Sequence, residues 1–257
     1  MRRGNWVVKD AVGLVMGTLV DRLAKLRHEA QRDWRRRAKQ RKREESRPGD
    51  WRQLGAALLQ GLLRLVAIVA LPFFVLVRGA VFFYERGRVP AWLALLVAAL
   101  LTTGLVTLYA SWLLRTLTGR SPVLLVAKWV ALPLVVSYCG LSLLYLSRVN
   151  AKPEVRAYYT SVHPLLRLAL STWILVDDGL VVTDMRRSRE DYPRMRLPVN
   201  ETSLHYRQAD GWVHAVDLRT ARRGWLRNRM VQVYFWMMGF GTLRHVGTAD
   251  HLHVELD

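Results

Sequence analysis

Three residues in the C-terminal part of the chain, His205, Asp217 and His253, have the side-chain types of a catalytic metal site. Histidine nitrogens and carboxylate oxygens are ordinary zinc ligands, and a catalytic zinc site uses three protein ligands and keeps a fourth position open. His251 stands two residues before His253, and Asp250 stands three residues before it. A histidine or a carboxylate beside the metal can act as a general base. These residues therefore predict metal-assisted hydrolysis.

The order and spacing of these residues resemble a known enzyme family. The chain has Ser-x-His ending at His205, Ala-Val-Asp ending at Asp217, and an acid three residues before His253. This pattern resembles the zinc D-alanyl-D-alanine metallopeptidases, whose superfamily includes lysostaphin-type endopeptidases and hedgehog domains. The resemblance covers about residues 160 to 257. It implies that these three side chains bind Zn2+.

The same resemblance implies the other catalytic residues. In one branch of the superfamily an acid before the last histidine is the general base, and this role maps onto Asp250. In other branches the first histidine of His-x-His is the base, and this role maps onto His251, so both alternatives stay open. The family also binds the substrate carboxylate through an arginine at the end of an early strand. The segment Val181 to Arg187 looks similar, which leaves Arg186 and Arg187 as candidates.

His214 is a rival to Asp217 as a metal ligand. Eleven residues separate His205 from Asp217, more than the six that are usual in the family, and His214 lies among them. The longer loop is tolerable because the entropy of loop closure grows only logarithmically with length. Positions 214 and 217 are an odd number of residues apart, so their side chains face opposite sides of one strand. This parity favours Asp217.

Composition and charge predict a membrane protein. The chain has 257 residues and a net charge of +19, which suits an anionic membrane surface or a nucleic acid. Ala91–Leu114 carries no charge and Pro122–Leu146 carries only Lys128, and about 20 apolar residues are enough to cross a bilayer. A further span is expected at about Leu65–Tyr84, if Arg78 snorkels or faces a partner helix.

The first 52 residues set the expected orientation. Thirteen Lys or Arg lie between Arg22 and Arg52, so this basic arm is expected in the cytoplasm. With three spans the C-terminal domain then lies outside, in the periplasm or the extracellular space. We expect the arm to contact anionic lipid and not nucleic acid, since no nucleic-acid-binding fold or aromatic platform accompanies it. Apolar residues at helical spacing from Trp6 to Leu26 predict an interfacial helix.

A transmembrane region at 53–148 and an α+β domain at 155–257 complete the expected architecture. The domain is expected to contain a helix near Pro164–Trp173 and a longer one after the second strand. Residues from Val231 to Met238 should belong to that longer helix and pack as core. Strands are expected near Leu180–Thr183, Val213–Leu218, Thr242–Val246 and His251–Glu255.

The sequence thus predicts a membrane-anchored zinc metallopeptidase. The resemblance implies that it hydrolyses peptide bonds of peptidoglycan stem peptides, as a D-alanyl-D-alanine carboxypeptidase or as an endopeptidase. The alternative is a non-catalytic, cell-wall-binding membrane protein that zinc only stabilises. Peptidoglycan peptides and anionic lipids are the expected partners, and no nucleic acid is expected.

Overall fold

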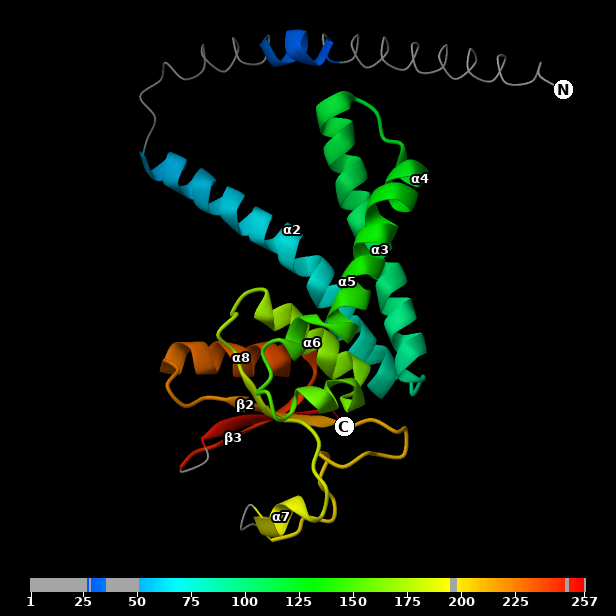
Figure 1. Ribbon diagram of the computed structural model, residues 1–257. Helices are drawn as coiled ribbons and strands as arrows, with labels where there is room; N and C mark the ends of the chain where they lie inside the picture. Colours follow the sequence, from blue (N-terminus) through cyan, green and yellow to red (C-terminus); the bar gives the residue numbers. More distant parts are fainter. Residues whose placement is uncertain (1–26, 28, 36–50, 195–197, 248–249, 257) are drawn as a thin grey trace, which may run out of the picture. The chain divides into compact units, whose positions relative to one another are not determined.

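The computed structural model of the chain describes residues 27, 29–35, 51–194, 198–247 and 250–256 (Figure 1). The expected interfacial helix at residues 6–26 and most of the basic arm lie outside these residues. The chain forms two compact units. The first comprises the residues up to Val66 together with Tyr109–Pro122, and the second comprises Ala67–Leu108 together with Val123–Asp257.

Three helical segments are long and apolar enough to cross a membrane, as the sequence predicted. They are Gln53–Glu85, Ala91–Thr118 and Val123–Arg148. The first belongs to helix α2, which runs over Trp51–Glu85 and so begins well before Leu65. The second is helix α3, Ala91–Thr118. A membrane protein is the class that these helices fit.

The third segment is not a uniform α-helix. It consists of α4 (Val123–Val126), the π-helical turn η1 (Ala127–Ala131), α5 (Leu132–Leu144) and the 3-10 turn η2 (Leu146–Arg148). Pro133 is the second residue after the π-helical turn, and its ring nitrogen cannot donate the hydrogen bond that a regular helix requires there. The wider turn absorbs this interruption without ending the helix.

The rest of the second unit is an antiparallel sheet with helices. All four expected strands form, and the sheet order is β1-β2-β4-β3. After the 3-10 turn η3 (Arg156–Ser161) the elements are α6 (Pro164–Ile174), β1 (Val182–Asp184), α7 (Asp191–Arg194), β2 (Ala215–Arg219), α8 (Trp225–Met238), β3 (Gly241–His245) and β4 (His251–Glu255). Figure 1 shows α6 and α8 on the same side of the sheet.

The two faces of the sheet differ in polarity because side chains alternate along each strand. Leu252 and Val254 of β4 are buried on the face that α6 and α8 cover. His251 and His253 occupy the alternate positions and face the other side. The buried face shares one hydrophobic core with α6, α8 and the C-terminal half of α2, where Val77 and Ala80 are fully buried.

Helix α8 corrects one expectation. Gly239 ends the helix in the left-handed conformation, with φ of 101°. Val231 and Met238 are buried as expected, but Trp236 is 70% exposed and Met237 is 50% exposed. The expectation that the whole run packs as core is therefore wrong in part, because only one side of the helix faces the sheet.

Candidate metal centre

Strand pairing brings Asp217 and His253 together. Asp217 lies directly opposite His253 in the antiparallel ladder of β2 and β4, so both side chains project from the same face of the sheet. His205 comes from the loop before β2, and its Nδ1 lies 2.8 Å from the carbonyl oxygen of Met185. This backbone contact aims the other ring nitrogen of His205 at the two strand residues.

Three ligand atoms converge at this point. Oδ1 of Asp217 lies 3.3 Å from Nε2 of His205 and 2.9 Å from Nδ1 of His253. The two histidine nitrogens are 3.3 Å apart. Ligand atoms about 2.0–2.1 Å from a tetrahedral metal ion lie about 3.3 Å from one another. The group His205, Asp217 and His253 could therefore hold a metal ion; His205 and Asp217 are buried, and His253 is partly exposed.

Each of the two histidines has an inner ring nitrogen, which faces the cluster, and an outer one, which faces away. The hydrogen bond of the outer nitrogen determines whether the inner nitrogen carries a lone pair or a proton. Nδ1 of His205 donates its proton to the Met185 carbonyl, so Nε2 of His205 keeps a lone pair. Nε2 of His253 lies 3.2 Å from Oε2 of Glu255, and donation to that carboxylate leaves a lone pair on Nδ1. A metal ion would be bound by these two lone pairs and one carboxylate oxygen. Without an ion, a proton on His253 can take this place: burial lowers the pKa of His253, but the hydrogen bond to Asp217 and the charges of Asp217 and Glu255 outweigh burial and raise it.

A glycine makes the contact between His253 and Glu255 possible. Gly241 lies opposite Glu255 in the ladder of β3 and β4. A Cβ atom at position 241 would come within 2.7 Å of Cγ and 2.9 Å of Oε1 of Glu255. The absence of a side chain at Gly241 therefore leaves room for the carboxylate that orients His253.

Arg187 fixes the carboxylate of Asp217. Its guanidinium donates to Oδ2 of Asp217 and, at 2.6 Å, to Oδ2 of Asp184. Burial raises the pKa of Asp217, but hydrogen bonds from His205 and His253 and the charge of Arg187 outweigh burial and hold that pKa well below its usual range. Asp217 is therefore anionic, with one oxygen held by Arg187 and the other facing the histidines.

The two candidate arginines point to different places. Arg186 is exposed, and its guanidinium carbon lies 5.7 Å from the centre of the Tyr158 ring. Arg187 lies against Asp217 in the metal cluster. Of the two, the structure brings Arg187 to the site.

The two candidate bases also differ. Both oxygens of Asp250 accept hydrogen bonds from Arg244 at 2.9 Å, and Oδ1 accepts another from Thr220 at 2.6 Å. The hydrogen bond from Thr220 is the largest cause of the lowered pKa of Asp250. Nε2 of His251 lies 3.7 Å from Oδ1 of Asp217. His251 therefore contacts the cluster, whereas Arg244 and Thr220 engage the Asp250 carboxylate.

His245 and Glu255 were missed from the sequence. His245 lies opposite His251 in the ladder of β3 and β4, with the two rings stacked at 4.7 Å. Burial, together with His251 and His253, lowers the pKa of His245. Residues two apart on one strand share a face, so Glu255 could have been inferred from His253, but His245 required knowledge of which strands pair.

A second group, His163, Asp210 and His214, also has metal-binding side chains. Nδ1 of His163 accepts a hydrogen bond from the backbone N–H of Leu165 at 3.3 Å, which caps α6. In the neutral ring Nε2 of His163 therefore carries the proton and offers no lone pair. That nitrogen lies 3.8 Å from Oδ2 of Asp210 and makes no hydrogen bond with any described residue.

His214 belongs to this second group and not to the site of Asp217. Its Nε2 lies 2.9 Å from Oδ2 of Asp210, and its Nδ1 lies 3.1 Å from the carbonyl oxygen of Leu256. The structure thus separates His214 from Asp217, in keeping with their opposite parity.

A scan against models of known protein families found no match to this chain, and searches of curated proteins and of solved structures found none either. Any proposal of function therefore depends on the geometry of the site and on the resemblance of its sequence pattern.

Proposed function

We propose that this protein is a membrane-anchored zinc metallopeptidase that hydrolyses peptide bonds of peptidoglycan stem peptides. The convergence of His205 Nε2, Asp217 Oδ1 and His253 Nδ1 carries the proposal, because two nitrogens and one carboxylate oxygen are a catalytic zinc ligand set. The substrate class follows from the resemblance to the zinc D-alanyl-D-alanine metallopeptidases. A D-alanyl-D-alanine carboxypeptidase and an endopeptidase would both use the same zinc-assisted hydrolysis of a peptide bond.

A zinc ion held by these three residues would polarise the scissile carbonyl and lower the pKa of an attacking water towards neutrality. The side chains of His253 and His251 are both partly exposed, at 17% and 23%, which leaves access for a peptide. Hydrolysis adds the oxygen of that water to the carbonyl carbon and breaks the carbon–nitrogen bond of the peptide.

His251 is the proposed general base. It would take a proton from the attacking water and later give a proton to the leaving amine, so that the protein ends the cycle unchanged. Its Nε2 is within 3.7 Å of the cluster, and imidazole is the side chain suited to exchanging a proton near neutral pH. Asp250 is the weaker candidate, since its hydrogen bonds to Thr220 and Arg244 lower its pKa and so make its carboxylate a weaker base.

Arg187 is the proposed partner of the substrate carboxylate and also positions Asp217. Its side chain is 16% exposed, so it is accessible from the site. A guanidinium can hold a carboxylate through two parallel hydrogen bonds. The carboxylates of Asp184 and Asp217 already neutralise much of the positive charge of Arg187. Arg187 would therefore bind a product carboxylate weakly enough for the product to leave.

Cleavage of purified muropeptides by the full-length protein, followed by mass spectrometry, tests the peptidase proposal. We expect the zinc-loaded protein to release D-alanine or to cleave crosslinks, and His205→Ala to do neither. His214→Ala is the matched control, because it removes a buried histidine of the second group and should leave cleavage intact. Muropeptides that are retained without any change in mass would favour the non-catalytic cell-wall-binding alternative and refute the peptidase.

The proposed site of action is outside the cytoplasmic membrane. The basic N-terminal arm, followed by three candidate spans, supports a cytoplasmic N-terminus and a C-terminal domain on the other side. Reporter proteins fused to the two ends should therefore report opposite compartments. Two cytoplasmic ends would contradict a wall peptidase even if the metal site were intact.

A further inference from the structure

Helix α8 is apolar on two opposite sides. Its inner side packs Val231, Phe235 and Met238 into the core. A helix on the surface of a water-soluble domain normally has a polar outer side, so an apolar outer side requires an apolar cover. The outer apolar residues and their exposed fractions are Trp225 76%, Leu226 62%, Met230 48%, Val233 38%, Trp236 70% and Met237 50%.

Four of these residues form one stripe. Leu226, Met230, Val233 and Met237 are spaced by four, three and four residues, which places them on one side of the helix, opposite Val231 and Phe235. We name these four residues the outer stripe.

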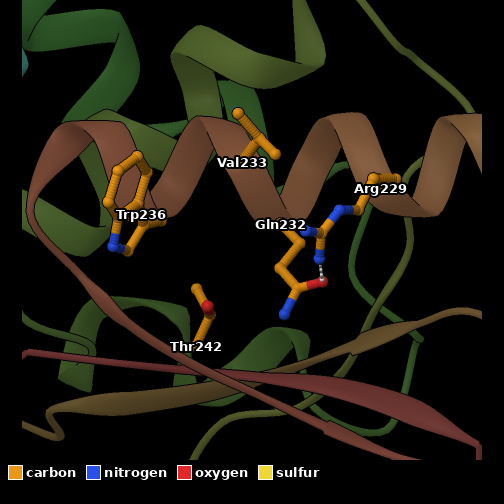
Figure 2. Close-up of a pocket in the computed structure, with 5 residues that line it drawn as sticks. All are labelled: Arg229, Gln232, Val233, Trp236 and Thr242. Carbon is orange, nitrogen blue, oxygen red and sulfur yellow. Dashed lines mark hydrogen bonds between the residues drawn. The ribbon is translucent and has the colours of Figure 1, made fainter.

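The polar residues of α8 lie on another side. Figure 2 shows Val233 pointing away from the strands, whereas Gln232 and Arg229 point towards Thr242 of β3. Arg229 donates to Gln232 at 3.1 Å. Arg229 and Gln232 line a pocket beside the sheet together with Val233, Trp236 and Thr242. The other three residues of the outer stripe, Leu226, Met230 and Met237, are 62%, 48% and 50% exposed.

Contacts within the second unit connect α8 to the candidate membrane spans. Gly239, at the C-terminal end of α8, packs against Arg78 and Val81 of α2, and both residues belong to the first candidate span. A cation at that end of α8 is favourable because the last carbonyl groups of a helix carry partial negative charge. The end of α8 is therefore next to residues of a span.

A second connection runs through α6. The hydroxyl of Tyr234 in α8 donates to the carbonyl oxygen of Ala169 in α6 at 2.9 Å. Thr172 of α6 shares a 2.7 Å hydrogen bond with Tyr138 of α5, which belongs to the third candidate span. Helix α8 is thus connected to two candidate spans. The membrane that these spans would cross is therefore the nearest apolar medium for the outer stripe.

Charge and aromatic residues suit a lipid headgroup layer. Helix α8 contains Arg227 and Arg229 and no acidic residue, and Arg222 precedes it. Helices that lie in the membrane interface combine arginines with an apolar side that carries tryptophan and leucine. Trp225 and Trp236 lie near the two ends of α8, and tryptophan is enriched at the level of the headgroups.

We infer that α8 is an interfacial helix whose outer stripe lies in the headgroup–acyl boundary of the bilayer that the spans cross, with its arginines at anionic headgroups. The inference does not depend on zinc or on peptidase activity. It has a consequence for the metal site: α8 covers one face of the sheet and Asp217 and His253 project from the other. The membrane contact therefore directs the candidate metal site away from the lipid.

Site-directed fluorescence quenching in the full chain tests this inference. Met230→Cys and Met237→Cys are made separately in a Cys139→Ser background, since Cys139 is the single cysteine of the chain. Val246→Cys, beyond β3 and 83% exposed, is the matched control. Each protein is labelled with a polarity-sensitive dye and reconstituted in vesicles that contain phosphatidylglycerol. The dye is then quenched by aqueous iodide or by lipids that carry a nitroxide near the headgroup.

Labels at positions 230 and 237 should be quenched by the nitroxide lipid and should be several-fold less sensitive to iodide than the label at position 246. Iodide sensitivity equal to that of the control would overturn the inference. Protection from both quenchers would also overturn it and would indicate a second copy of the chain or another protein on the outer stripe. Because two independent positions are labelled, misfolding of one variant does not decide the outcome.

Discussion

The two histidine–aspartate–histidine groups of this protein contain the same side chains but offer different chemistry. In the first group, Nδ1 of His205 donates to a backbone carbonyl, so its inner nitrogen has a lone pair. In the second group, Nδ1 of His163 accepts from the backbone N–H of Leu165, so its inner nitrogen carries a proton. The backbone partner of each outer nitrogen thus decides whether the group can accept a metal ion.

Metal content is the largest expected difference between the two groups. The purified full-length protein should contain about one zinc, and His205→Ala or His253→Ala should lose it. The loss in affinity should exceed the about 10- to 100-fold that removal of an outer contact causes, because a ligand is lost. His214→Ala should retain the metal.

Elemental analysis of the folded proteins measures these contents. Zinc retained in His205→Ala and lost in His214→Ala would reverse the assignment of the two groups.

Catalysis separates the two candidate bases within the first group. His251→Ala should lower kcat by about 100- to 10,000-fold while zinc content is unchanged, because a general base contributes to rate and not to coordination. Asp250→Asn should lower kcat much less. Hydrolysis rates on muropeptides, measured with zinc content for each variant, check this. A larger loss in Asp250→Asn would make the acid the base.

The outer contact of His253 gives a smaller expected effect. Glu255→Gln should weaken zinc binding by about 10- to 100-fold, because an uncharged partner makes His253 a less basic ligand. Gly241→Ala should act in the same direction by displacing the Glu255 carboxylate. Competition with a chelator measures the affinities. Asp210→Asn, which changes the carboxylate of the second group, should leave them unchanged.

The second group should affect stability in acid. Burial is the largest cause that lowers the pKa of His163, to about 3, and the nearby His214 acts in the same direction. The pKa of His163 in the unfolded chain is about 6.5. Between about pH 6.5 and pH 3, His163 is therefore protonated in the unfolded chain and neutral in the folded protein, so the free energy of unfolding falls as the pH falls. At pH 5 the loss is about 2 kcal/mol by this linkage.

His163→Asn keeps a side-chain acceptor that can cap α6 and removes the titration. Its thermal midpoint in detergent should therefore drop less between pH 7 and pH 5 than that of the unchanged protein. An equal drop in the two proteins would mean that His163 is not the residue that titrates.

The sequence determined much of this protein by itself. Long apolar runs with few charges predicted the three helices that could cross a membrane, since length and composition alone decide that property. The sequence also predicted the four strands, and the parity of one strand placed Asp217 and His214 on different sides. The order of His205, Asp217 and His253 was enough to suggest one metal site, because two histidines and one carboxylate are a common set of zinc ligands.

Only the tertiary structure decided the remaining features, because they depend on which distant segments pair. Strand register placed His245 beside His251 and Gly241 beside Glu255. Loop geometry brought Arg187, and not Arg186, to Asp217. Val233 and Met237 of the outer stripe were expected in the core, since apolar residues in a sequence do not reveal which side of a helix will find a partner. Backbone contacts with Met185 and Leu165 then made one histidine a candidate metal ligand and the other a helix cap.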